Sequence, residues 1–340
     1  MAPSRNDTEI PGSMQPGPPC LFATGVSDEF AAGVATRLGI EPAAFELRAF
    51  EDGEHKMRPL DEVRGQDVYL LHALDDRPDS PVDERLCRLL FFIGTLRDQG
   101  AAHMTLICPY LCYSRKDRRT KARDPVTSRY VAELMEAVGV QTVAVLEPHN
   151  PAAFENAFRC PAITLNAYGP LADAVLAHTA DTRSPLTVVS PDTGGAKRAA
   201  AFGRRLAART GAEPAMAFLD KRRSEGVVSG DTFVGDVSGR TAVIIDDLIA
   251  SGTTLMRAVD ACRRHGARQV FALATHGLFA TGAEALFQPA GPDRLFITDS
   301  VAPRMESLWG DQLERVTLQP LLADIIAALH RGGSVSELTD

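Results

Sequence analysis

A helix-then-strand pattern recurs four times along the 340 residues of this sequence, and it constrains the fold more than any other feature. Each helical segment ends at a glycine, and a short apolar strand follows. The four pairs, helix first, are 82–99 and 104–108, 128–138 and 143–146, 196–210 and 215–219, and 253–265 and 270–274. Apolar residues at helical spacing give each helix one apolar face, and the glycine supplies the left-handed residue that closes it. The pattern predicts an α/β fold of mainly parallel sheets with helices on both faces.

The length of the chain and the distribution of these pairs predict two domains of similar design. Two pairs fall in each half, and 340 residues suffice for two hydrophobic cores. We expect an N-terminal domain over 20–165 and a C-terminal domain over 166–332. Residues 1–19 are rich in proline, glycine and polar residues, and we expect them to form a disordered tail.

Charge and composition indicate which classes of partner the protein binds and in which cell compartment it lies. The chain has 36 Lys and Arg against 44 Asp and Glu, a net charge of -8, which argues against nucleic acid or a membrane surface as a partner. The longest apolar runs are too short to span a bilayer, and the N-terminus lacks the apolar stretch of a secretory signal. Six cysteines without a CxxC pair favour reduced thiols. We therefore expect a cytoplasmic protein.

Polar and charged segments follow the predicted strands, at the positions where ligands bind in open α/β sheets. These segments are 109–119, 147–149, 191–195, 220–223 and 246–247. Basic residues cluster at 115–123 and 221–223 in spite of the negative net charge. The sequence therefore predicts a site that handles small phosphate compounds.

The strongest local signal follows the apolar run 243–245. Asp246 and Asp247 come next, and a short turn then opens a helix. The hydroxyl side chains at this helix start are Ser251, Thr253 and Thr254. Backbone N–H groups and hydroxyls at a helix start form a cradle for a monophosphate, and two adjacent carboxylates can hold ribose hydroxyls. The alternative is an ordinary capped helix preceded by acidic loop residues.

This segment resembles the PRPP-binding loop of the type I phosphoribosyltransferase fold. Six further segments narrow the resemblance to the ribose-phosphate pyrophosphokinases, or PRPP synthetases. They are Phe-Glu-Asp-Gly-Glu at 50–54, Tyr-Ser-Arg-Lys-Asp-Arg at 113–118, the stretch 121–127, Pro-Asp-Thr-Gly-Gly at 191–195, Asp-Lys-Arg-Arg at 220–223 and Gly-Asp-Val-Ser-Gly-Arg-Thr at 235–241. The resemblance runs in order from about residue 48 to residue 276.

The resemblance implies a fold and an activity. The fold is two phosphoribosyltransferase-like domains, with the ATP-binding segments in the first and the ribose 5-phosphate loop in the second. The activity is that of a transferase, a kinase of nucleotide biosynthesis. It moves the diphosphoryl group of ATP to the 1-hydroxyl of ribose 5-phosphate, giving PRPP and AMP, with Mg²⁺ as cofactor. The resemblance also implies a homo-oligomer in which the ATP site lies near a subunit interface.

The resemblance further assigns roles to individual residues. Lys221 is the catalytic cation and Arg223 its partner on the transferring phosphates. His149 and Asp192 are magnesium ligands. The ATP-binding residues are Asp52, Gly53, Glu54, Arg115 and Lys116. The residues that bind ribose 5-phosphate are Asp246, Asp247, Ala250, Ser251, Gly252, Thr253 and Thr254.

The sequence departs from the family pattern at several positions. Lys116 stands where the family has glutamine, and Glu147 and Ala250 each stand where it has aspartate. Two other functions therefore stay open: a base phosphoribosyltransferase that uses PRPP, and a catalytically impaired, regulatory relative of the synthetase. Without the resemblance, 221–223 would be a solvated charged face and His149 a structural histidine.

Overall fold

The computed structural model describes residues 17–179, 184–224 and 227–339. The elements of the first half are β1 (Cys20–Ala23), α1 (Asp28–Leu38), β2 (Phe45–Ala49), β3 (His55–Pro59), β4 (Asp67–Leu71), α2 (Val82–Asp98), β5 (His103–Cys108), α3 (Thr127–Val138), β6 (Thr142–Leu146), α4 (Pro151–Ala157) and β7 (Ala162–Leu165). The helices of the second half are α5 (Tyr168–Ala177), α6 (Ala196–Thr210), α7 (Thr253–Arg264), α8 (Gln319–His330) and α9 (Ser336–Thr339). Its strands are β8 (Leu186–Ser190), β9 (Ala215–Ser224), β10 (Val227–Val234), β11 (Thr241–Ile249), β12 (Gln269–Gly277), β13 (Arg294–Thr298) and β14 (Leu313–Val316). Most of the predicted tail, residues 1–16, lies outside the described residues.

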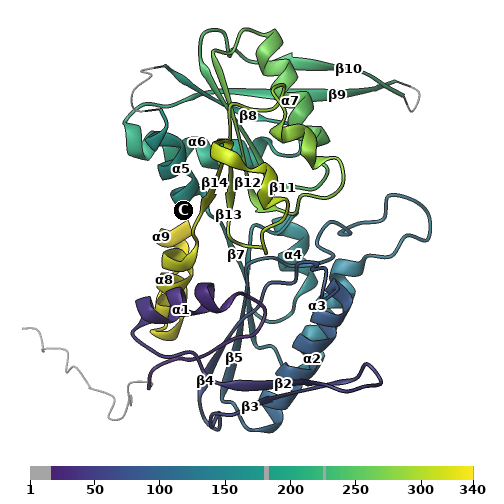
Figure 1. Ribbon diagram of the computed structural model, residues 1–340, viewed down its shortest axis with the longest axis vertical. Helices are drawn as coiled ribbons and strands as arrows, with labels where there is room; N and C mark the ends of the chain where they lie inside the picture. The colour runs from purple at the N-terminus through teal and green to yellow at the C-terminus, as the bar shows by residue number, and fades with distance from the viewer. Residues whose placement is uncertain (1–16, 180–183, 225–226, 340) are drawn as a thin grey trace, which may run out of the picture.

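Two mainly parallel sheets form the framework of the molecule (Figure 1). The first has the order β1-β4-β5-β6-β7, and all its neighbouring strands are parallel. The second has the order β10-β9-β8-β11-β12-β13-β14, in which β10 runs antiparallel to β9 and the other pairs are parallel. This arrangement confirms the predicted α/β fold class.

The four predicted helix–strand pairs are present as α2–β5, α3–β6, α6–β9 and α7–β12. The observed boundaries differ from the predicted ones chiefly because β9 and β12 run several residues further. The glycines after the four helices all have positive φ values, between 72° and 122°: Gly100, Gly139, Gly211 and Gly266. Their role in closing the helices is therefore confirmed.

Helices cover both faces of each sheet because successive strand residues point to opposite sides. In β4, Tyr69 and Leu71 join a core with α1 and α8, whereas Val68 and Leu70 join a core with α2 and α3. In the second sheet, β11 divides its side chains in the same way between α5 and α6 on one face and α7 on the other.

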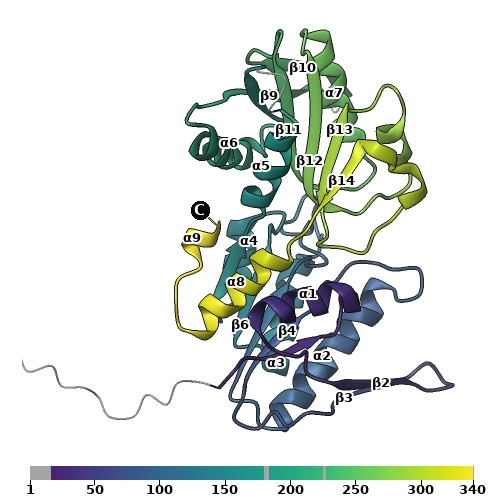
Figure 2. The same ribbon diagram turned by 60° about the vertical axis from the view of Figure 1, so that its left-hand side comes forward.

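The helix α8 returns from the second half and packs against α1 of the first half (Figure 2). Leu322 of α8 and Phe30 of α1 are buried in the same core. Outside that core, Arg37 Nε lies 3.0 Å from Asp324 Oδ1. The predicted C-terminal domain includes α8, and the domain boundaries stay a prediction. No described helix is long and apolar enough to cross a membrane.

The carboxyl ends of the two sheets face one another across the middle of the molecule. His276 on β12 lies with Nε2 3.2 Å from the carbonyl oxygen of Leu146, at the end of β6. The N–H of Ala302, after β13, donates to Asp75 Oδ2, after β4, over 3.0 Å. Because ligands bind at the carboxyl ends of parallel strands, both sheets deliver side chains to one central region.

The buried histidine at this joint predicts an acid-sensitive fold. Burial lowers the pKa of His276 to about 4, against an ordinary value of 6.5. Below pH 6.5 the unfolded chain therefore binds more protons than the folded one. The contribution of neutral His276 to stability is complete above that pH and is lost as the pH falls toward the folded-state pKa.

We expect the free energy of unfolding to fall by about 1.4 kcal/mol per pH unit for this histidine as the pH drops below its ordinary pKa. His72, whose pKa burial lowers to about 3, should add a similar slope. Urea denaturation across this pH window measures the slope, and His276→Gln should flatten it. A slope that His276→Gln leaves unchanged would assign the acid sensitivity to other groups.

Candidate functional site

The turn between β11 and α7 has the form expected of a phosphate cradle. The helix begins at Thr253, after Gly252, whose φ is 73°. A Cβ on Gly252 would lie 2.8 Å from Leu286 Cδ1, so the turn requires glycine. The N–H groups of the first helical turn lack intrahelical partners and favour an anion. Ser251 Oγ, 3.0 Å from Thr253 Oγ1, adds a hydroxyl at the same place.

A cavity of about 240 Å³, the phosphate cavity, opens in front of this turn. Its lining residues come from both halves of the chain and are Arg115, His149, Asp192, Asp246, Asp247 and residues 248–255. The structure thus brings together all seven residues predicted to bind ribose 5-phosphate and both predicted magnesium ligands. One detail corrects the sequence interpretation: β11 continues to Ile249, so the acidic pair lies within the strand instead of after it.

The buried guanidinium of Arg198, on α6, holds the acidic pair. Its Nη1 lies 3.2 Å from Asp246 Oδ1, and its Nη2 lies 3.4 Å from Asp247 Oδ1. Burial raises the pKa of Asp247, but the hydrogen bond with His149 and the Arg198 charge outweigh burial and hold that pKa below its usual range. Burial and the Asp247 charge raise the pKa of Asp246. The pair therefore offers a fixed carboxylate that accepts hydrogen bonds from hydroxyl groups.

Glu147 ties the end of β6 to the second half of the chain. Its buried carboxylate accepts hydrogen bonds from Arg198 Nε at 2.9 Å, the Tyr168 hydroxyl at 2.6 Å and Thr275 Oγ1 at 2.5 Å. Its φ of 39° is uncommon for a residue other than glycine, and the surrounding hydrogen bonds hold the backbone there. This link fixes the loop that carries His149 against the acidic pair.

His149 and Asp192 reach the phosphate cavity from different halves of the chain. His149 Nδ1 lies 2.7 Å from Asp247 Oδ2, and this hydrogen bond raises the pKa of His149. Asp192 Oδ1 accepts a hydrogen bond from the N–H of Gly195 over 3.0 Å. Within the described ranges, no three side chains of His, Cys, Asp or Glu form a cluster that could hold a metal ion. A cation bound here would take its remaining ligands from water or substrate phosphates, as Mg²⁺ commonly does.

The sequence matches models of two known protein domains. The N-terminal domain of ribose phosphate pyrophosphokinase matches residues 20–139, and the phosphoribosyl synthetase-associated domain matches residues 227–340. The ribose-phosphate pyrophosphokinase of Caldanaerobacter subterraneus is 33% identical over 319 residues, which cover 94% of this chain and 96% of that protein. The chain belongs to the ribose-phosphate pyrophosphokinase family.

Further pyrophosphokinases show the same degree of similarity. The enzyme of Ureaplasma parvum is 34% identical over 322 residues, 94% of each chain, and that of Bacillus caldolyticus is 33% identical over 322 residues. The crystal structure of phosphoribosylpyrophosphate synthetase from Mycobacterium smegmatis matches with a TM-score of 0.81 at 30% identity, and it covers 93% of this chain and 100% of that chain. The predicted family and the fold of two phosphoribosyltransferase-like domains are therefore confirmed.

In this member of the pyrophosphokinase family, the predicted ATP-binding residues lie in three places. Arg115 lines the phosphate cavity. Lys116 Nζ instead pairs with Asp124 Oδ2 of the same loop over 2.8 Å. Residues 52–54 form the exposed turn of the β2–β3 hairpin, which projects from the first half (Figure 1). Asp52 Oδ1 accepts a hydrogen bond from the N–H of Glu54 over 3.1 Å within that turn.

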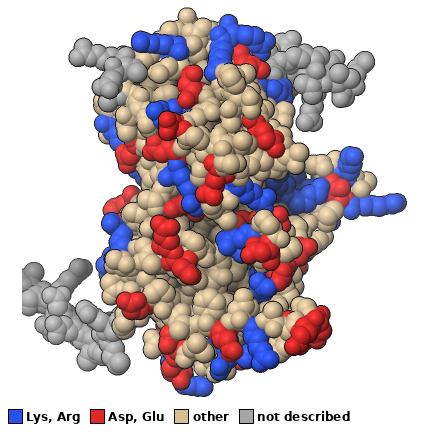
Figure 3. Space-filling view, viewed as in Figure 1, with Lys and Arg blue, Asp and Glu red and all other residues tan. Residues whose placement is uncertain are grey.

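The two predicted basic clusters lie in different halves of the pyrophosphokinase fold. The cluster 115–123 lies in the loop between β5 and α3, and Figure 3 shows Lys and Arg side chains gathered along this projecting loop and in the hollow beside it. The predicted catalytic residues Lys221 and Arg223 belong to β9, which pairs with β10 in a two-stranded arm (Figure 1).

The sequence interpretation missed Arg198 and the role of Glu147. One signal was available for Arg198. It lies in the first turn of α6, where a positive charge opposes the helix dipole, so an arginine there implies a negatively charged partner. For Glu147 the signal was absent, because its three partners come from distant parts of the chain.

Proposed function

We propose that this protein is a ribose-phosphate diphosphokinase that transfers the diphosphoryl group of ATP to the 1-hydroxyl of ribose 5-phosphate. One observation carries the proposal: the phosphate cradle at 251–254 and the acidic pair open into one cavity with Arg115, His149 and Asp192. The cradle suits the 5-phosphate, and the Asp246 and Asp247 carboxylates suit the ribose hydroxyls. Family membership supports the same reaction.

In the proposed reaction, the oxygen at C1 of the sugar forms a bond to the β-phosphorus of ATP. The bond from that phosphorus to the bridging oxygen of the α-phosphate breaks, AMP leaves with that oxygen, and the hydroxyl proton is released. Such a step asks the protein mainly for alignment and for positive charge on the phosphoryl oxygens. We assign that charge to Arg115 at the cavity and to Lys221 and Arg223 of the β9–β10 arm.

The donor set at the cavity fits a magnesium ion. The Asp192 carboxylate would supply an oxygen ligand and His149 an imidazole nitrogen, and the phosphates of ATP would complete the coordination. When bound, the ion would neutralise phosphate charge. His149, held by Asp247, would keep its ring oriented toward that ligand set.

We also propose that the protein acts as a homo-oligomer in the cytoplasm. The exposed turn 52–54 lies on a hairpin that projects away from the body of the chain (Figure 1). From there it can contribute Asp52 and Glu54 to the ATP site of a neighbouring subunit. The test mixes two inactive variants, one without residues 52–54 and one without the Lys221 side chain. Mixed oligomers should regain activity only if one ATP site takes residues from two subunits.

The direct test is an assay of the purified protein with ATP, ribose 5-phosphate and Mg²⁺. We expect AMP and PRPP to form in equal amounts, and a chelator such as EDTA should stop the reaction until Mg²⁺ is restored. No AMP under conditions where a known synthetase is active would overturn the proposal. Release of pyrophosphate from PRPP in the presence of a free base would identify a base phosphoribosyltransferase instead.

A further inference from the structure

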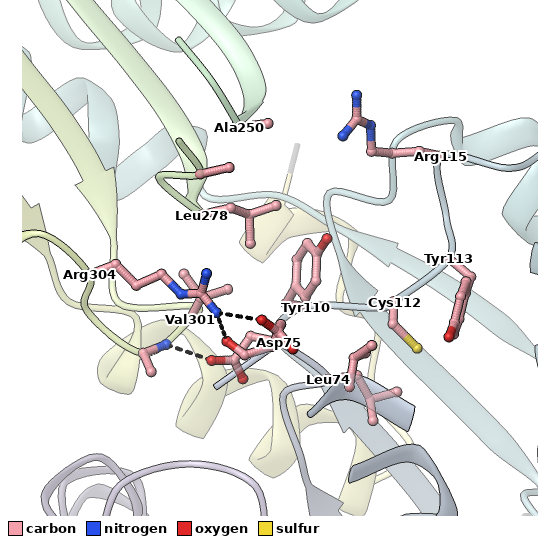
Figure 4. Close-up of a pocket in the computed structure, with 14 residues that line it drawn as sticks. Leu74, Asp75, Tyr110, Cys112, Tyr113, Arg115, Ala250, Leu278, Val301 and Arg304 are labelled. Carbon is pink, nitrogen blue, oxygen red and sulfur yellow. Dashed lines mark hydrogen bonds and ion pairs between the residues drawn. The ribbon is translucent and has the colours of Figure 1, made fainter. Parts of the chain in front are cut away.

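A second cavity of about 280 Å³, the ring cavity, adjoins the phosphate cavity (Figure 4). It lies between the segments that follow β4 and β5 in the first half and those that follow β12 and β13 in the second. Arg115 and Ala250 line both cavities. The two cavities are therefore neighbours across these residues, and Ala250 directly precedes the phosphate cradle.

Small side chains keep the ring cavity open, and apolar side chains form much of its wall. Ala250, Ala280 and Ala302 line the ring cavity without filling it, and Leu278 and the ring of Tyr110 point into it (Figure 4). Such a space favours a flat and largely apolar ring, because ring faces gain from burial against aliphatic and aromatic groups.

The floor of the ring cavity is built in advance of any ligand. The Asp75 carboxylate is buried and satisfied by Arg77 Nε at 3.1 Å, Arg85 Nη2 at 3.1 Å and the N–H of Ala302 at 3.0 Å. At the rim, Arg304 Nη2 lies 3.0 Å from Asp76 Oδ2 and offers polar groups to the edge of a ring. A rigid apolar space with a few polar groups at its edge is the usual form of a small-molecule site.

We propose that the two cavities together bind a nucleoside 5′-monophosphate. Its phosphate occupies the cradle, its ribose hydroxyls contact the acidic pair, and its base enters the ring cavity. This inference rests on the proposed function, since it takes the phosphate cavity to be the ribose 5-phosphate site. AMP, the product of the proposed reaction, therefore competes with ribose 5-phosphate for that site.

The position of Ala250 favours a monophosphate over the base of the ATP donor. The ring cavity meets the phosphate cavity at Ala250, one residue before Ser251 of the cradle, so the sugar of a nucleoside monophosphate would connect a phosphate in the cradle to a base in the ring cavity. The proposed donor phosphates lie instead beside His149 and Asp192, which line the phosphate cavity and not the ring cavity.

The test is calorimetric titration of the full-length protein with AMP in Mg²⁺ and without ATP, repeated in the presence of ribose 5-phosphate. We expect ribose 5-phosphate to displace AMP. Ala280→Phe fills the ring cavity from an exposed position outside the phosphate cavity. It should weaken AMP binding by about tenfold or more and leave the affinity for ribose 5-phosphate within about twofold. Ala302→Leu serves as the second variant if Ala280→Phe fails to fold.

AMP binding that ribose 5-phosphate does not displace, or that both cavity-filling variants leave unchanged, would overturn the inference. Two further results would overturn it and leave the proposed function intact. In the first, the protein binds ribose 5-phosphate but does not bind AMP. In the second, a non-hydrolysable ATP analogue displaces AMP and ribose 5-phosphate does not. If neither ligand binds, the assignment of the phosphate cavity fails and both proposals fall. Competition between AMP and ribose 5-phosphate in a protein that transfers no diphosphoryl group supports the inference and rejects the proposed function.

Discussion

Lys221→Ala should lower the turnover number at least about a hundredfold, on the scale measured when one donor to a developing oxyanion is removed. The physical reason is that negative charge develops in the transition state between the transferring phosphoryl group and the leaving oxygen, so a cation placed there lowers the barrier more than it strengthens substrate binding. The KM for ATP should change little. Steady-state measurement of AMP formation at saturating ribose 5-phosphate gives both constants.

Arg222→Ala is the matched control, because it removes one positive charge from the neighbouring position of the same strand, β9. The family resemblance gives Arg222 no catalytic role, and we expect its turnover number to stay within about threefold of the wild type. Equal losses in both variants would show that only the net charge of the arm matters. A near-normal turnover number in Lys221→Ala would remove Lys221 from the mechanism.

Arg198→Met should produce the largest loss of stability of any substitution at the site. Arg198 is 13% exposed and contacts the carboxylates of Glu147, Asp246 and Asp247. Methionine keeps most of the side-chain volume but leaves these buried carboxylates without their cation, which costs about 3–5 kcal/mol in comparable buried pairs. Urea or thermal unfolding measures the loss, and binding of ribose 5-phosphate should weaken with it.

Arg209→Met is the control on the same helix, α6. Arg209 pairs with Asp173 at the surface, where the aspartate side chain is 63% exposed, so the loss should stay within about 1 kcal/mol. If Arg198→Met were no more destabilising than Arg209→Met, the central carboxylates would not depend on Arg198 for their charge balance.

Much of the fold could be predicted from the sequence because the informative interactions are local. The helix spacing, the closing glycine and the apolar strand of each pair lie within about thirty residues or fewer, and the structure confirms all four helix–strand pairs. The cradle at 251–254 is local in the same sense, since the glycine, the hydroxyls and the helix start are consecutive. The prediction that the acidic pair lies next to the cradle is confirmed, but the pair lies within β11 and not after it.

The rest of the site depends on contacts between distant segments. Glu147 accepts hydrogen bonds from α5, α6 and β12, and no periodicity in the sequence reports that three such elements converge. The ring cavity likewise exists only because the carboxyl ends of both sheets face one another. Small residues such as Ala280 and Ala302 carry no signal in the sequence, since their effect is the space that they leave open.

The contact of α8 with α1 has a consequence for how the protein is made. The first 165 residues contain every strand of the first sheet, yet one face of that sheet is completed by Leu322 and its neighbours, about 150 residues later in the chain. During synthesis, the first half leaves the ribosome with part of its apolar surface exposed, and that surface is covered only when α8 emerges. The packing of α8 against α1 therefore completes the core of the first half and connects the second half to it. A protein truncated before α8 would lose both.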